Sequence, residues 1–243
     1  MENLKSIIPN SLTSLNLACG CIATLSMLNH HYLLGIVLIF VATIADFLDG
    51  FLASLLKVQS DLGKELDSLA DMVSFGVVPG TILYVALSKA LGIESFDEIL
   101  KTQNYLPFLG YIVTVFSALR LAKFNIDTRQ SNSFIGLPTP ANTLFFITIP
   151  LIWIFGEDNE TANVLISSLP LLIGFTIIFS YLLVAEIPLI ALKFKSWVFR
   201  ENIEKYLLIL GGIISISILG YLAIPVILIL YILVSIIENI KKV

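Results

Sequence analysis

The sequence predicts an all-α, polytopic membrane protein with about eight transmembrane helices. Of its 243 residues, 57% are hydrophobic and only 13% are charged, whereas an ordinary soluble domain has about 25% charged residues. A helix needs about 20 mostly apolar residues to cross a bilayer, and eight segments of the chain meet this requirement. The basic residues concentrate in every second loop, as expected when alternate loops face opposite sides of a membrane.

The predicted elements follow one another along the chain with short connections. Residues 1–10 are expected to form a short interfacial helix that ends at Pro9, with Asn10 or Ser11 capping the next helix. Only the region of Gly220 separates the last two spans, so these should form a tight hairpin. The basic and aromatic stretch at 185–205 should lie at the level of the headgroups. The predicted spans are residues 11–29, 32–56, 64–88, 105–123, 138–155, 162–182, 206–221 and 223–239.

The positions of Lys and Arg predict the orientation. With eight spans, both termini share one side of the membrane with the loops at 57–64, 123–137 and 183–205. Only Lys89 and Lys101 lie on the opposite side. The positive-inside rule therefore predicts a multi-pass protein of the cell membrane with both termini in the cytoplasm. The basic residues on the predicted cytoplasmic side are Lys5, Lys57, Lys64, Arg120, Lys123, Arg129, Lys193, Lys195, Arg200, Lys205, Lys241 and Lys242.

Four aspartates stand at the cytoplasmic ends of the second and third spans. Residues three or four apart share a helix face, so the acidic and small residues form two stripes. The stripes are Asp46, Asp49, Gly50 and Ala53 on the second span, and Gly63, Asp67 and Asp71 on the third. Because these spans are consecutive and antiparallel, both stripes can face one pocket. The small residues allow a helix or a ligand to approach closely.

Four carboxylates in one pocket need compensation, since each Asp at bilayer depth costs roughly 3 kcal/mol. Oxygen ligands suit Mg²⁺ or Mn²⁺, with Ca²⁺ as an alternative, rather than zinc. Four carboxylates suit two such cations, which can clamp phosphoryl oxygens. Two other interpretations stay open on the residues alone. The aspartates could pair with lysines or cap helices, or they could mark a cation transporter or proton relay.

The spacing of this acidic stretch carries a resemblance to a known family. It reads Asp46-x2-Asp49-Gly50-x2-Ala53-x9-Gly63-x3-Asp67-x3-Asp71, which resembles the signature of the CDP-alcohol phosphatidyltransferases. The family has an Arg where this chain has Ser54. Lys57 and Lys64 are near enough in sequence to supply the positive charge instead.

Two further stretches resemble one branch of that family, the bacterial and archaeal phosphatidylserine synthases. They are "FSALRLAKFN" at 116–125 and "FIGLPTPA" at 134–141. The resemblance covers about residues 8–195. It implies a six-helix core at 11–195, with 196–243 as a C-terminal hairpin extension of unknown role. It also implies a homodimer among membrane lipids, and nothing in the sequence suggests a nucleic-acid partner.

The resemblance implies that the L-serine hydroxyl attacks CDP-diacylglycerol to give phosphatidylserine and CMP. By carry-over, one cation would be held by Asp46, Asp49 and Asp67, and a second by Asp46, Asp67 and Asp71. Asp71 is expected to be the general base, because it ends the stripe nearest the membrane interior. The residues expected to contact CDP-diacylglycerol are Thr13, Asn16, Asp49, Gly50, Ala53, Ser54, Gly63 and Asp67.

Serine needs a cation for its carboxylate and an acceptor for its ammonium group, which favours Arg120, Lys123 and Asn125 as its binding residues. Anchoring of lipid headgroups is the other interpretation of Arg120 and Lys123. Thr13 and Asn16 could equally make ordinary interhelical hydrogen bonds. Among enzymes, the alternative is a sister transferase that uses glycerol 3-phosphate or inositol phosphate as acceptor, for which a richer cluster of basic residues would be expected.

Overall fold

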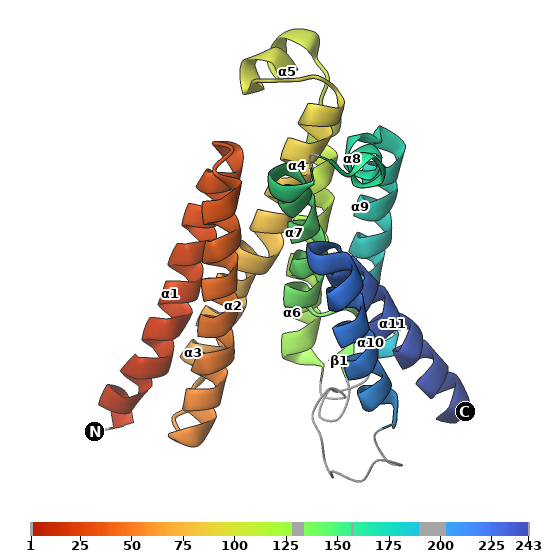
Figure 1. Ribbon diagram of the computed structural model, residues 1–243. Helices are drawn as coiled ribbons and strands as arrows, with labels where there is room; N and C mark the ends of the chain where they lie inside the picture. Colours follow the sequence, from red (N-terminus) through yellow and green to blue (C-terminus); the bar gives the residue numbers. More distant parts are fainter. Residues whose placement is uncertain (1, 128–133, 157, 190–202, 243) are drawn as a thin grey trace.

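The computed structural model describes residues 2–127, 134–156, 158–189 and 203–242. The described chain is a bundle of helices (Figure 1). Its α-helices are α1 (Glu2–Leu28), α2 (Tyr32–Leu55), α3 (Asp61–Met72), α4 (Val78–Ala90), α5 (Phe96–Thr102), α6 (Ile112–Ile126), α7 (Thr139–Phe155), α8 (Glu160–Ser167), α9 (Leu169–Val184), α10 (Ile203–Leu219) and α11 (Ala223–Lys242). Shorter elements are a π-helical turn η1 (Val73–Val77), the 3-10 turns η2 (Leu106–Tyr111) and η4 (Gly220–Leu222), and two antiparallel two-residue strands, β1 (Phe134–Ile135) and β2 (Pro188–Leu189).

Long apolar helices dominate the described chain, which confirms the predicted all-α membrane fold. Five helical stretches are long and apolar enough to cross a bilayer, and the bent pair α8–α9 makes a sixth if its halves count as one span. The five are Lys5–Leu28, Tyr32–Leu55, Asp61–Ala90, Leu106–Ile126 and Lys205–Glu238.

Two features explain why this count reaches six spans and not the predicted eight. Helix α7 has 17 residues, at the lower limit of the length that a crossing needs. The stretch Lys205–Glu238 contains two legs, because α10 and α11 fold back on each other. Leu230 Cδ1 lies 3.5 Å from where a Cβ on Gly211 would stand, whereas the same 19 residues in one straight helix would span about 28 Å. The predicted hairpin is therefore present, and the number of complete crossings stays a prediction.

Two boundaries differ from those predicted. Helix α1 continues through Pro9, so the expected end of a separate helix at that residue is wrong. Pro9 has no N–H to donate to the Lys5 carbonyl four residues earlier. Because Lys5 is exposed, the helix tolerates this loss. The predicted span 162–182 is broken at Ser168, where α8 and α9 meet at 71°. Pro170 explains this break, because it cannot donate to a preceding turn.

The third span forms the centre of the bundle and carries two of the aspartates. Helix α3 continues through η1 into α4, and ten of the thirteen α4 residues are buried. Phe145 on α7 stacks on Phe179 of α9, with ring centroids 3.8 Å apart, which fixes these two helices beside the centre. Both chain termini lie at the same end of the bundle as the start of α3 (Figure 1).

Part of the predicted charge pattern lies outside the described residues. This holds for Arg129, Lys193, Lys195 and Arg200, and for most of the stretch at 185–205 that was expected at the headgroup level. The cytoplasmic assignment of this end therefore stays a prediction.

Candidate active site

The two acidic stripes meet at one end of the bundle. Asp46, Asp49 and Asp67 each offer a carboxylate oxygen, and these oxygens all lie within 4.8 Å of one another. The Asp46 carboxylate also lies close enough to the Asp71 and Asp67 carboxylates to interact with both. Carboxylates from α2 and α3 thus share one site, and Asp46 is the residue that touches both acids of the other helix.

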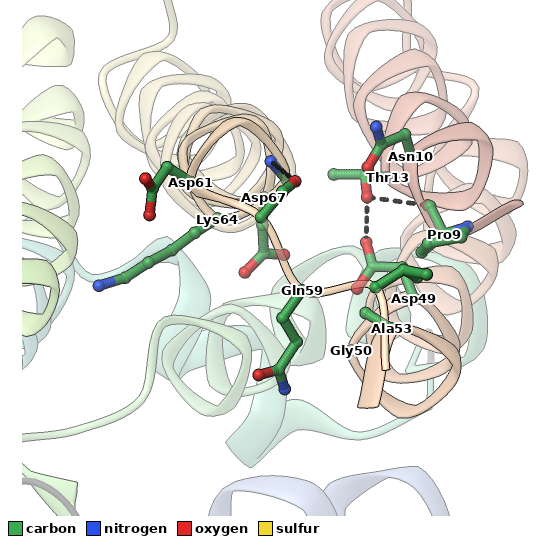
Figure 2. A pocket seen from close by; sticks show the side chains of 13 residues that line it. Pro9, Asn10, Thr13, Asp49, Gly50, Ala53, Gln59, Asp61, Lys64 and Asp67 are labelled. Atoms are coloured by element: carbon green, nitrogen blue, oxygen red, sulfur yellow. Dashed lines mark hydrogen bonds between the residues drawn. The ribbon is translucent and has the colours of Figure 1, made fainter. Parts of the chain in front are cut away.

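Helix α1 orients one acid from each stripe. The Thr13 hydroxyl lies 2.5 Å from Asp49 Oδ2 and 3.0 Å from the Pro9 carbonyl oxygen, so its single proton can donate to either acceptor (Figure 2). One turn further along α1, Asn16 Nδ2 donates to Asp71 Oδ1 at 3.2 Å. Positions i and i+3 share a helix face, and this face of α1 therefore supports both acidic stripes.

A close approach of α1 to the π-helical turn makes this support possible. A Cβ at Gly20 would lie 2.9 Å from Ser74 Cα, and closer still to the Ser74 hydroxyl. The Ser74 hydroxyl donates to the Asn16 carbonyl at 2.9 Å, which joins the two elements where Gly20 lets them touch. Asn16 consequently reaches Asp71, three residues before Ser74.

Local hydrogen bonds stabilise the turn between α2 and α3. Lys57 has a left-handed φ of 56°, and the N–H of Val58 donates to the Ala53 carbonyl at 3.0 Å, which closes the end of α2. The Ser60 hydroxyl accepts from the Gly63 N–H at 3.1 Å, which caps the start of α3. This short connection keeps the acidic ends of both helices at the same depth.

A pocket of about 480 Å³ opens beside the aspartates. Figure 2 shows Asp49 and Asp67 on its walls, with Thr13 and Gly50 close by. A Cβ added at Gly50 would meet no atom within 4 Å, so open space borders this glycine. The lining residues are Pro9, Asn10, Thr13, Asp49, Gly50, Ala53, Val58, Gln59, Ser60, Asp61, Gly63, Lys64 and Asp67.

Most of the residues predicted to contact the nucleotide therefore lie together. Two do not line this pocket. Ser54 is exposed and absent from its wall, and Asn16 is fully buried behind it, next to Asp71. Of the two lysines that could replace the family arginine, Lys64 lines the pocket and Lys57 does not. Lys64 Nζ donates to the Asn125 carbonyl at 3.2 Å.

The acidic cluster fits a divalent cation. All of its ligands are oxygens, as Mg²⁺, Mn²⁺ and Ca²⁺ prefer. Asp67 Oδ1 is buried and has no hydrogen-bond partner in the described part of the chain, although a buried carboxylate oxygen is costly to leave unpaired. Neighbouring carboxylates in contact repel unless a proton or a cation lies between them. The donor set and the unpaired oxygen together indicate a metal site.

The three residues predicted to bind serine do not share one environment. Arg120 is buried, lies close enough to interact electrostatically with Asp71 and Asp46, and stacks on Phe124 at 4.9 Å. Lys123 is exposed. Asn125 Nδ2 donates to the Ser68 hydroxyl at 2.9 Å, so this side chain connects α6 to α3. Only Arg120 is directed toward the acidic site.

Sequence reasoning missed the polar residues at the start of α7. Thr139, Asn142 and Thr143 are all buried, and their i, i+3, i+4 spacing in an apolar helix could have identified a shared polar face. Thr143 donates to the Phe75 carbonyl at 3.1 Å. Pro79 is the sequence signal for this contact. It has no N–H to donate to the Phe75 carbonyl four residues earlier, so this carbonyl needs another donor.

Comparison with known proteins agrees with this geometry. The model of the CDP-alcohol phosphatidyltransferase family matches residues 6–190. The chain is 39% identical over 133 residues to the CDP-diacylglycerol–serine O-phosphatidyltransferase of Bacillus subtilis, across 55% of this chain and 69% of that protein. It is 29% identical over 206 residues to the Helicobacter pylori J99 protein of the same name, across 84% of this chain and 78% of the relative.

A relative from an archaeon also matches this chain. The protein of that name from Methanocaldococcus jannaschii is 36% identical over 149 residues, across 60% of this chain and 63% of its own length. The family match spans all the aspartates, both helices that carry them and the helix that supports them. The chain therefore belongs to the CDP-alcohol phosphatidyltransferase family.

Proposed function

We propose that this enzyme transfers the phosphatidyl group of CDP-diacylglycerol to L-serine, which yields phosphatidylserine and CMP. The observation that carries the proposal is the convergence of carboxylates from α2 and α3 beside an open pocket. The names of the relatives support serine as the acceptor. We assign the catalytic unit to residues 11–195 and treat residues 196–243 as an addition. Among the described residues, the acids grouped at the site come from α2 and α3.

Two divalent cations, Mg²⁺ or Mn²⁺, would be held by the aspartates. We assign Asp46, Asp49 and Asp67 to one cation, and Asp46, Asp67 and Asp71 to the other. Asp46 belongs to both sets, in keeping with its contacts to Asp67 and Asp71. When bound, such cations neutralise the phosphates and the charge that develops on them during transfer.

The pocket would bind the nucleotide and diphosphate. Gly50, Ala53 and Gly63 offer a surface without long side chains. Lys64 also lines the pocket, and its ammonium group donates to the Asn125 carbonyl on α6. Positioning of reactants and compensation of charge are what phosphoryl transfer mainly needs from a protein. The nucleotide would enter from the cytoplasmic end, since the pocket lies at the end of the bundle that the basic residues assign to the cytoplasm.

Asp71 is proposed as the general base. The serine hydroxyl oxygen forms a bond to the β-phosphorus, which carries the diacylglycerol. The bond from this phosphorus to the bridging oxygen breaks, CMP leaves, and the hydroxyl proton passes to the Asp71 carboxylate. Asn16 holds Asp71 in place through its hydrogen bond, and Arg120 binds the serine carboxylate.

The family resemblance also implies a homodimer, which size-exclusion chromatography with light scattering would test. The function itself is tested by CMP release from purified protein supplied with Mn²⁺ and CDP-diacylglycerol. We expect release that depends on L-serine and is lost, by about 10²-fold or more, in Asp71→Asn, while CDP-diacylglycerol still binds. Release that ignores L-serine and responds to glycerol 3-phosphate would contradict the proposed acceptor. Ion flux in liposomes without CMP would contradict the enzyme class.

A further inference from the structure

We infer that Thr139 and Asn142 on α7 complete the acceptor site by binding the ammonium group of the amino-acid substrate. The inference rests on the proposed function, because it concerns how serine is recognised at the same site. It assigns a role to two residues that lie outside the acidic stretch and outside the pocket in Figure 2.

The first argument is that these side chains are buried without partners. Thr139 and Asn142 have no exposed surface. The Thr139 hydroxyl and both polar atoms of the Asn142 amide lack a hydrogen bond in the described part of the chain, as does Nε of the buried Arg120. Buried polar groups nearly always have partners, and each exception calls for an explanation. A polar ligand that enters between α6 and α7 supplies one.

The second argument is depth. The Phe75 carbonyl accepts from Thr143 on α7 at 3.1 Å and lies 3.5 Å from the Ser117 hydroxyl of α6. Phe75, Thr143 and Ser117 therefore lie at the same depth in three helical elements. One helical turn from this level toward the acidic end, Asp71 lies four residues before Phe75. On α6, Arg120 lies one turn from the same level, three residues after Ser117.

The same step along α7 leads from Thr143 back to Thr139, and Asn142 lies between the two levels. Thr139, Arg120 and Asp71 therefore stand at similar depth on neighbouring elements, since one turn is about 5.4 Å in each helix. Arg120 is close enough to Asp71 to interact with it electrostatically. A small molecule held beside Asp71 and Arg120 would therefore lie at the depth of the polar face of α7.

The third argument is chemical complementarity with a zwitterion. Arg120 is the one buried Lys or Arg among the described residues, and a single guanidinium suits one carboxylate. The Thr139 hydroxyl oxygen and the Asn142 amide oxygen are neutral acceptors, which suit an ammonium group. The hydroxyl of serine is then left to face Asp71. A phosphorylated acceptor would need more positive charge than these residues offer.

The experiment measures the KM for L-serine and the KM for CDP-diacylglycerol in Thr139→Val and Asn142→Leu. Both changes keep the side-chain size and remove the acceptor. Loss of a hydrogen bond to a charged group should raise the KM for L-serine about tenfold or more, while the KM for CDP-diacylglycerol stays within about twofold, as expected for a residue that does not touch it.

The matched control is Thr148→Val. Thr148 on α7 is also buried, and its hydroxyl has no hydrogen-bond partner among the described residues. It lies nine residues further on, which places it on the opposite face and about 13 Å deeper. This variant should keep the wild-type KM for L-serine. A second control uses 3-hydroxypropionate, which lacks the ammonium group, as an inhibitor competing with serine. Its inhibition constant should be the same in wild type, Thr139→Val and Asn142→Leu.

The outcomes separate the inference from the proposed function. If the wild type releases CMP with serine but both variants keep its KM for serine, the inference is wrong and water pairs with the buried polar atoms of Thr139 and Asn142. An equal loss of affinity for both substrates would also overturn the inference, as would weaker inhibition by 3-hydroxypropionate in the variants. In either case the effect would not depend on the ammonium group. If the wild type shows no serine-dependent release at all, it is the proposed function that fails.

Discussion

Asn16 on α1 donates a hydrogen bond from Nδ2 to Asp71 Oδ1 at 3.2 Å, across 55 residues of sequence. The Asn16 carbonyl in turn accepts from the Ser74 hydroxyl. The acid proposed as general base is thus oriented by a helix that carries none of the four aspartates. Orienting partners of this kind matter to a metal site almost as much as its ligands do.

Replacement of Asn16 tests this relationship. Asn16→Leu keeps the size of the side chain and removes the donor, so we expect kcat to fall about 10–100-fold, the usual cost of losing an outer-shell partner. Asn29→Leu is the control, because Asn29 Nδ2 donates to the Leu25 carbonyl four residues earlier in the sequence. Steady-state CMP release measures both. Wild-type kcat in Asn16→Leu would show that Asp71 needs no support from α1.

Gly50 allows the pocket to be filled in steps. A Cβ there meets nothing within 4 Å, so Gly50→Ala and Gly50→Leu should fold normally. We expect the KM for CDP-diacylglycerol to rise little in the first and about tenfold or more in the second, because the larger side chain occupies space meant for the ligand. Gly174→Leu on α9, where a Cβ also meets nothing, is the control. Equal KM values in all three variants would place the nucleotide elsewhere.

Substitution of Gly20, unlike substitution of Gly50, should destabilise the fold. Its Cβ would collide with Ser74, so Gly20→Ala should destabilise the fold by about 1–3 kcal/mol, the range for overpacking. Gly174→Ala should instead stabilise slightly, by about 0.5–1 kcal/mol, since alanine favours a helix more than glycine does. Melting in detergent compares the two. If Gly20→Ala melts no lower than wild type, α1 does not approach η1 as closely as described.

Lys64 and Lys57 offer a matched test of the missing family arginine. Lys64 lines the pocket and Lys57 does not, so Lys64→Met should raise the KM for CDP-diacylglycerol by up to about fivefold, as for an exposed charge pair worth up to ~1 kcal/mol. Lys57→Met should leave it unchanged. The reverse order would mean that Lys57 supplies the charge. A large rise in activity in Ser54→Arg would mean that neither lysine does.

Local spacing predicted the parts of the site that depend on one helix at a time. The stripes of Asp46 with Asp49 and of Asp67 with Asp71 follow from helical periodicity, and a short turn forces them together. The sequence also predicted the hairpin of α10 and α11, because Gly220 interrupts a long apolar run.

Tertiary relationships were harder to predict. The environment of Lys123 and Asn125 depends on how α6 rotates against α3, which periodicity does not determine. The buried state of Thr139 and Asn142 depends on where α7 meets η1. The continuation of α1 through Pro9 needed knowledge that the freed Lys5 carbonyl lies in an exposed part of the helix. Such cases turn on packing between elements and on exposure, not on local preference.

The central claim is that carboxylates from α2 and α3 hold the same cations, with Asp46 common to both. Titration with Mn²⁺, followed by electron paramagnetic resonance of the free ion, tests it without any turnover. Wild type should bind two Mn²⁺ per chain, and Asp46→Asn should weaken both sites by about tenfold or more. Asp61→Asn, which removes an exposed acid of the same pocket, should bind as wild type does. Unchanged binding in Asp46→Asn would contradict the claim.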